Sequence, residues 1–317
     1  MNQEQKKLRL GFVTTYSGRW PRELPEQRDE EYGRWLSENL PQVKVVRAGC
    51  IGCNRETLET IVEEFKKASV DVLVMVYGAF TGDDAAAYLT EMLKVPIILW
   101  APYELPFEKN ERLYANALCS MTMNAAALHR LGAKYHAVYG SREDERAAAK
   151  IKSLIMAYHT VKAMRHTNLG LLGYRPTAFY NCAFDEGLIR RTFGIKMEET
   201  DLKVIFDTME ALPREEWEAD MRSMEEAYNM DTLPEGHLVN HSRLYLALSE
   251  VMKNQGYDFA TIKCWPEMGS LHTTPCAVLG RLADEGVCIG CEGDVDAELA
   301  QIAQHYLTGL PTFITDM

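Results

Sequence analysis

The sequence predicts an α/β protein made of two Rossmann-like, doubly wound domains with mainly parallel sheets. Its 317 residues exceed the length at which one hydrophobic core usually keeps growing. Short apolar runs alternate with helical segments, and the run DVLVMVYG (71–78) is almost continuously apolar, which is typical of a strand buried on both faces of a parallel sheet. A long helical stretch at 141–167 separates the two halves. We therefore expect an N-terminal domain over 1–167 and a second domain over 168–317.

The elements of the first half follow from its apolar periodicity. Strands are expected at 8–16, 43–49, 71–78 and 95–100. Asn54 is expected to cap the helix that begins after it, because the apolar residues that follow recur at helical spacing.

The second half resumes the pattern with the apolar runs NLGLLGY and LKVIF, followed by helices near 217–230 and 237–256. Its last apolar runs each stop at a polar or charged residue, as strands do where α/β proteins bind ligands. These strand ends are where we expect the chemistry.

Composition and charge narrow the possible partners. The net charge of -12 and the lack of a basic stripe argue against nucleic acid. No apolar run approaches the roughly 20 residues needed to span a bilayer, and the N-terminus does not resemble a signal peptide, so a cytoplasmic protein without a membrane partner is expected. Four of the eight cysteines lie among apolar neighbours and are expected to be reduced core thiols: Cys119, Cys182, Cys264 and Cys276.

The tetrapeptide CIGC occurs twice, at 50–53 and 288–291. A structural zinc site needs four ligands close together, whereas these copies fall in different predicted domains, so their spacing argues against one shared site. We expect reduced cysteines beside a glycine at a strand end. A redox use of Cys50 and Cys53 stays open, because both precede a helix.

Two carboxylates are the main candidates for chemistry. Glu292 follows the apolar run VCIGC, and Asp316 ends the apolar run LPTFIT, with one helix between them. A right-handed crossover would place the two strands side by side and direct both acids into one cleft. Such a pair can hold Mn²⁺ or Mg²⁺ and move protons. The alternative is that an acid here caps the following helix, for which Asp294 or Asp296 is the more natural choice.

The segment KCWPEM places a cation, an indole and a carboxylate together at another strand end: Lys263, Trp265 and Glu267. This combination suits a polyhydroxylated ligand, although the pattern alone favours an ordinary loop after a strand. The loop SGRWPREL after the first strand lacks the glycine pattern of dinucleotide sites.

With these segments together, the chain resembles the L-fucose isomerase and L-arabinose isomerase superfamily. The most specific stretch is CEGDVDAELAQIAQHYLTGLPTFITDM, where Glu292 and Asp316 fall on the glutamate and aspartate that hold the catalytic metal. The resemblance implies a metal-dependent aldose–ketose isomerase that moves a proton between C1 and C2 through a cis-enediol. Glu292 and Asp316 would bind Mn²⁺, or Mg²⁺ or another divalent ion, and also act as the acid–base pair.

Weaker similarity covers SGRWPREL, VYGAFTG and KCWPEM. It implies a monosaccharide or modified sugar as substrate, and a homo-oligomer with its sites at subunit interfaces. The implied sugar contacts are Arg19, Trp20, Tyr77, Phe80, Lys263, Trp265 and Glu267. Arg19 and Arg22 could instead hold an anionic group on a modified, sulfonated sugar.

Family members carry a third, C-terminal domain that this sequence lacks. The resemblance therefore implies a fragment of a longer enzyme, or a member without that domain, with weak metal binding and little turnover. Two other functions remain open: a non-enzymatic two-domain sugar-binding protein, and a redox protein that uses Cys50 and Cys53.

Overall fold

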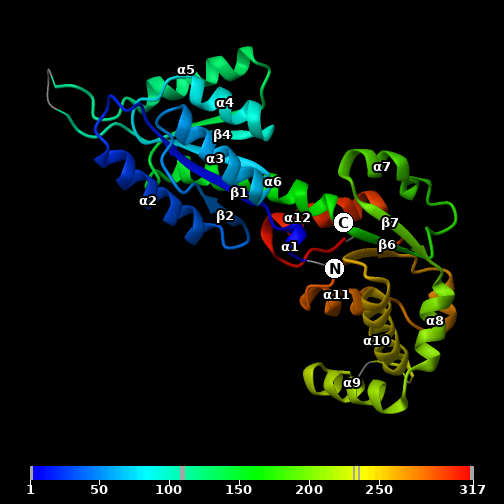
Figure 1. The fold of residues 1–317 in the computed structure, drawn as a ribbon. Helices are drawn as coiled ribbons and strands as arrows, with labels where there is room; N and C mark the ends of the chain where they lie inside the picture. Colours follow the sequence, from blue (N-terminus) through cyan, green and yellow to red (C-terminus); the bar gives the residue numbers. More distant parts are fainter. Residues whose placement is uncertain (1–2, 108–110, 231–232, 235, 315–317) are drawn as a thin grey trace. The chain divides into compact units, whose positions relative to one another are not determined.

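A computed structural model describes residues 3–107, 111–230, 233–234 and 236–314 (Figure 1). Apart from residues 1–2, the chain divides into two compact units, one covering Gln3–His159 and the other beginning at Thr160. Helix α6 (Glu145–Arg165) begins in the first unit and ends in the second, and is the long helix that the sequence predicts. Each unit has its own parallel sheet, so the predicted α/β class is confirmed.

The first unit contains a five-stranded sheet. Its strands are β1 (Arg9–Thr15), β2 (Lys44–Arg47), β3 (Val72–Tyr77), β4 (Ile97–Ala101) and β5 (Tyr135–Tyr139). Their order is β2-β1-β3-β4-β5 and every pair is parallel, which is the flavodoxin-like doubly wound topology. The short helix α1 (Gln3–Lys6) precedes β1.

Helices cover both faces of this sheet. Along β3, Val72, Val74 and Val76 belong to the core formed with α2 (Glu23–Asn39) and α6. The alternate residues Leu73, Met75 and Tyr77 belong to the core formed with α3, α4 and α5. Because both sets are buried, β3 is the continuously apolar strand that the sequence predicts. The second group of helices is α3 (Arg55–Ala68), α4 (Asp84–Leu93) and α5 (Ala117–Arg130).

Helix α3 begins where its capping residue was expected. The Asn54 side chain accepts a hydrogen bond from the Thr57 backbone N–H at 2.9 Å, and the Thr57 hydroxyl lies 3.1 Å from the Asn54 backbone N–H. This reciprocal capping box fixes the start of the helix directly after the first CIGC segment.

The second unit contains a four-stranded parallel sheet in the order β7-β6-β8-β9. Its strands are β6 (Asn168–Leu172), β7 (Lys196–Thr200), β8 (Phe259–Ile262) and β9 (Ile289–Cys291). One core joins the sheet to α8 (Leu202–Ala211), α10 (His237–Gln255) and α11 (Cys276–Asp284). Another joins it to α7 (Glu186–Phe193) and α12 (Val295–Thr308). Helix α9 (Arg214–Ala227) and the short 3₁₀ helices Tyr180–Cys182 and Glu267–Leu271 complete the unit.

Two expected strands are corrected. The run LKVIF belongs to helix α8, because Asp201 caps it and Leu202, Ile205 and Met209 are buried at helical spacing. The described part of LPTFIT, which ends at Ile314, forms no strand, and its Pro311 has no N–H to give to a ladder.

The burial of the cysteines differs from the prediction as well. Cys182 is buried and Cys264 is half-buried, but Cys119 and Cys276 are exposed because they lie on the outer faces of α5 and α11. In the described part of the chain, no helix has the length and apolar character needed to cross a membrane.

Candidate functional site

In the second unit, three neighbouring strands end at the same edge of the sheet. The chain leaves β6 at Gly173, β8 at Lys263 and β9 at Glu292. Strand order reverses between β6 and β8, and such switch points are where open α/β sheets bind ligands. The segment KCWPEM and Glu292 therefore lie where the sequence led us to expect them.

The backbone around Glu292 makes a tight left-handed turn. Glu292 has φ +61° and Gly293 has φ +68°. The Gly293 N–H donates to the Ile262 carbonyl oxygen at 3.1 Å, which fastens the turn to the end of β8. A Cβ on Gly293 would overlap the carbonyl oxygen of Tyr174, in the loop after β6. Only glycine lets these loops approach so closely at a positive φ.

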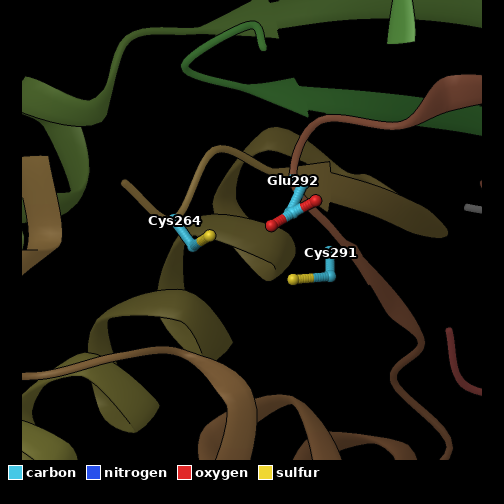
Figure 2. Close-up of side chains that lie close together, drawn as sticks. All are labelled: Cys264, Cys291 and Glu292. Carbon is cyan, nitrogen blue, oxygen red and sulfur yellow. The ribbon is translucent and has the colours of Figure 1, made fainter. Parts of the chain in front are cut away.

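Glu292 lies beside two thiols (Figure 2). One oxygen of its carboxylate, Cys264 Sγ and Cys291 Sγ all lie within 4.8 Å of one another, and all three residues are half-buried. In the described part of the chain, this is the one group of three or more acidic, cysteine or histidine side chains close enough to share a metal ion. Figure 2 shows the three side chains pointing toward one another from the ends of β8 and β9.

Each of the two thiols changes the pKa of the other. The hydrogen bond that Cys291 donates to Cys264 raises the pKa of Cys291, and burial raises it further. The same hydrogen bond lowers the pKa of Cys264, against the effects of burial and the Glu292 charge. Cys264 is therefore the thiol that ionises first.

Lys263 and Glu267 form an ion pair beside this cluster. Lys263 Nζ donates to Glu267 Oε1 at 2.5 Å. Burial is the largest single effect on Glu267 and raises the pKa of its carboxyl group, but the Lys263 hydrogen bond and charge, together with a backbone hydrogen bond, lower this pKa by more. Trp265, which lies between these two residues in the sequence, is exposed. Its ring packs edge-to-face against the Phe179 ring, with the ring centroids 5.6 Å apart. The structure thus brings together the cation, the indole and the carboxylate that were predicted to contact a sugar.

Asp294, and not Glu292, caps helix α12. Asp294 Oδ1 accepts a hydrogen bond from the Ala297 backbone N–H at 2.9 Å at the start of α12. Asp294 is thus the cap that the alternative interpretation named, and Glu292 is not needed for that role.

Four predicted sugar contacts lie in the first unit: Arg19 and Trp20 on the loop after β1, Tyr77 at the end of β3, and Phe80 on the loop that follows it. These strands are adjacent and flank that sheet's own switch point. Trp20 and Phe80 stack with ring centroids 6.2 Å apart, and the guanidinium of Arg112 lies 4.3 Å above the Trp20 ring. Arg19 is exposed, whereas Tyr77 is fully buried and its contact with a sugar stays a prediction.

The second predicted carboxylate, Asp316, lies outside the described residues. Sequence reasoning missed the proximity of Cys264 and Cys291, which were interpreted as ordinary reduced cysteines. Each cysteine follows a short apolar run at a strand end, beside a predicted site residue, but the sequence alone does not show that the two thiols lie close together.

The first CIGC segment has a different environment. Burial, together with the charges of Glu64 and Cys53, raises the pKa of Cys50. A reactive thiol needs a lowered pKa, so the redox hypothesis gains no support here. The two CIGC copies lie in different units, as expected.

Comparison with known proteins gives a consistent family assignment. Residues 11–165 match the family described as "Fucose/sulfoquinovose isomerase, N-terminal domain". A sulfoquinovose isomerase from Clostridium sp. (strain MSTE9) is 27% identical over 249 residues, which cover 77% of this chain and 55% of that protein. A sulfoquinovose isomerase from Priestia aryabhattai is 20% identical over 288 residues, covering 90% of this chain and 64% of that protein. The resemblance to the fucose isomerase-like superfamily is therefore confirmed.

The chain spans about half to two-thirds of the length of these curated relatives. Among solved structures, the periplasmic binding protein of an arabinose ABC transporter from Shewanella sp. ANA-3 aligns over 97% of this chain and 89% of its own. Its sequence identity is 11% and its TM-score 0.23, so this likeness carries no argument about fold or function.

Proposed function

Because the chain belongs to the fucose isomerase-like superfamily through residues 11–165, we propose that it is an aldose–ketose isomerase acting on a hexose, in particular a sulfonated one. The observation that carries the proposal is the half-buried Glu292 carboxylate at the edge where β6, β8 and β9 end. A carboxylate at this position can serve as a general base for a sugar bound across the strand ends.

The proposed reaction redistributes hydrogen within one molecule. Glu292 takes the proton from C2 of the open-chain aldose and returns it to C1, while the hydroxyl proton on O2 moves to O1. The substrate passes through a cis-enediol, and no external oxidant or reductant is needed. Lys263 and Glu267, which pair with each other, are proposed to hydrogen-bond hydroxyl groups of the sugar, and the exposed Trp265 ring is proposed to cover its C–H groups.

We also propose that a divalent cation, Mn²⁺ or Mg²⁺, takes part. Such an ion would polarise the carbonyl oxygen and acidify the neighbouring C–H bond. Glu292 would supply a carboxylate oxygen at a strand end, which is the type of ligand that a hard cation prefers. Asp316 is proposed as a second oxygen ligand on the basis of the family motif.

The sulfonate preference is proposed to come from Arg19. Arg22, its possible partner in holding an anion, already pairs with Glu26 at 2.7 Å, whereas Arg19 projects from the exposed loop after β1. An Arg19→Met variant should raise KM for sulfoquinovose but leave KM for the uncharged L-fucose nearly unchanged. An equal effect on both sugars would contradict a sulfonate contact.

Ketose formation from sulfoquinovose, L-fucose and L-arabinose tests the proposed function. EDTA should abolish activity and added Mn²⁺ restore it. Glu292→Gln should lower kcat by about 100- to 10,000-fold, the usual range for losing a general base. Asp296→Asn, an exposed acid on the neighbouring helix α12, is the matched control and should keep wild-type activity.

Two outcomes would point elsewhere. Tight sugar binding without ketose formation would favour the non-enzymatic binding protein. Activity that survives EDTA but is lost in Cys50→Ser would favour the redox alternative.

We further propose a homo-oligomer in which the loop that contains Phe80 contributes to the site of a neighbouring subunit. Phe80→Ala should then weaken substrate binding without lowering thermal stability.

A further inference from the structure

Cys264, Cys291 and Glu292 come from neighbouring parallel strands whose ends are held in place. Ile262 is in register with Cys291, so Cys264 lies two residues beyond the paired part of β8. The Lys263 N–H donates to the Leu172 carbonyl oxygen at 2.9 Å, and the Gly293 N–H donates to the Ile262 carbonyl oxygen at 3.1 Å. These bonds fix the backbone on both sides of the three side chains, and such preorganisation is what a metal site requires.

We propose that Cys264, Cys291 and Glu292 form a binding site for a thiophilic divalent cation of the Zn²⁺ type. Two sulfur atoms and one carboxylate oxygen suit Zn²⁺, which takes Cys, His and carboxylate ligands in a tetrahedral arrangement. Mn²⁺ and Mg²⁺ prefer oxygen ligands throughout. Three protein ligands leave a fourth position for water or another oxygen donor.

The dimensions of the cluster agree with this assignment. Zn–S bonds of about 2.3 Å and Zn–O bonds of about 2.0–2.2 Å place the ligand atoms of a tetrahedral site roughly 3.5–3.8 Å apart. The three ligand atoms already lie within 4.8 Å of one another. Small side-chain rotations on the fixed backbone are enough to close the remaining difference.

The neighbouring cation does not fill the site. Lys263, the basic residue next to Cys264, directs its ammonium group to Glu267 at 2.5 Å. The Lys263 ammonium group therefore pairs with Glu267.

This site does not depend on the proposed isomerase activity, because the inference rests on ligand chemistry alone. If the isomerase proposal also holds, Glu292 belongs to both sites, and Zn²⁺ should compete with Mn²⁺ for it.

Direct metal titration of the full chain under reducing conditions tests the inference. Cd²⁺ should produce an ultraviolet sulfur-to-metal charge-transfer band that saturates at one ion per chain, and equilibrium dialysis should give the same stoichiometry for Zn²⁺. Cys264→Ser and Cys291→Ser should each weaken binding roughly 100-fold, and Glu292→Gln at least about tenfold.

The matched control is the first CIGC segment. A double variant, Cys50→Ser with Cys53→Ser, removes two thiols from the other unit and should leave the band and the stoichiometry unchanged. Loss of the band in that variant, or its persistence in Cys264→Ser and Cys291→Ser, would overturn the proposal.

A measurement on the unmodified chain removes any dependence on how variants fold. The wild-type protein is treated with iodoacetamide with and without Zn²⁺, and alkylation of each cysteine is followed by mass spectrometry. Zn²⁺ should slow alkylation of Cys264 and Cys291 and leave the exposed Cys119 unaffected. Unchanged alkylation of Cys264 and Cys291 would contradict the site.

Discussion

Lys263 Nζ lies 2.5 Å from Glu267 Oε1 in the loop that follows β8. The lysine is the more buried partner, with 14% of its side chain exposed against 39% for the glutamate. This pair fixes the geometry of the loop on either side of the cis Trp265–Pro266 peptide bond. It orients a cation, an indole and a carboxylate toward the edge of the sheet where Glu292 lies.

The ion pair predicts a pH dependence of stability. Lys263 lowers the pKa of Glu267 below its usual value of 4.5, so the ionised carboxylate stabilises the folded state. That contribution is present above pH 4.5 and is lost as the pH falls through the lower, folded pKa. Glu267→Gln should cost about 0.5 kcal/mol at pH 7, because the pair is partly exposed, and almost nothing at the acid limit.

Urea denaturation of wild type and Glu267→Gln across this pH range measures the difference. Glu225→Gln, an exposed glutamate on α9, is the control and should show no such pH dependence. A cost for Glu267→Gln that grows as the pH falls would contradict the sign of the shift.

Because the turn at Gly293 leaves no room for a side chain, we expect even an alanine at this position to lower the stability of the protein strongly. Gly293→Ala adds a Cβ that overlaps the Tyr174 carbonyl oxygen at a residue with φ +68°. We expect a loss of about 3 kcal/mol or more in the free energy of unfolding, together with displacement of Glu292. Gly309→Ala is closely matched, because Gly309 has φ +69° and open space around it, and should cost only about 1 kcal/mol. Equal costs in chemical denaturation would show that the contact with Tyr174 is unimportant.

Arg28 connects α2 to the ends of two strands. Its buried guanidinium donates to the carbonyl oxygens of Tyr77 and Gly78 at 3.1 Å and of Tyr103 at 3.0 Å. Arg28→Met leaves these carbonyls without that donor and should cost about 3 kcal/mol. The control is Arg34→Met on the same helix, where the lost exposed pair with Glu30 should cost no more than about 0.5 kcal/mol. Similar melting temperatures for the two variants would contradict this role.

Ionisation of Glu298 should make the stability of the protein change with pH in the opposite direction to the change caused by Glu267. It is fully buried on α12, and burial raises its pKa well above the usual value of 4.5, aided by the Cys288 charge and opposed by the Gly290 N–H. The folded state therefore keeps this carboxyl group protonated, and its stability falls as the pH rises above 4.5.

The non-titrating variant Glu298→Gln should escape that loss. Its stability relative to wild type should increase steadily from pH 4.5 to pH 8 in thermal denaturation. Asp296→Asn, an exposed acid on the same helix, should show no such trend. A constant difference between Glu298→Gln and wild type would mean that Glu298 is ionised in the folded protein.

Much of the fold follows from local sequence. β3 was predictable because both of its faces are buried, and α3 because Asn54 and Thr57 form a capping box. LKVIF reads as an apolar run, and only its buried residues at helical spacing, together with the Asp201 cap, show it to be a helix. Strand β7, whose residues are mostly polar, carries little apolar signal because it lies at the edge of the sheet.

The candidate site was predictable in part. Glu292, Lys263, Trp265 and Glu267 could be placed from strand ends alone, since parallel strands end together at one edge. The thiols could not, because the proximity of Cys264 and Cys291 depends on the register of β8 against β9. That register is a tertiary property with no local signature.

Proton transfer by Glu292 is the central claim, and isomerisation in D₂O tests it most directly. The proton that Glu292 takes from C2 is held on a carboxylate, where it exchanges with solvent before delivery to C1, so the ketose formed by wild type should carry deuterium at C1. Glu292→Gln should lose both ketose formation and deuterium incorporation, while Asp296→Asn keeps both. A ketose without deuterium, or undiminished incorporation by Glu292→Gln, would contradict the account.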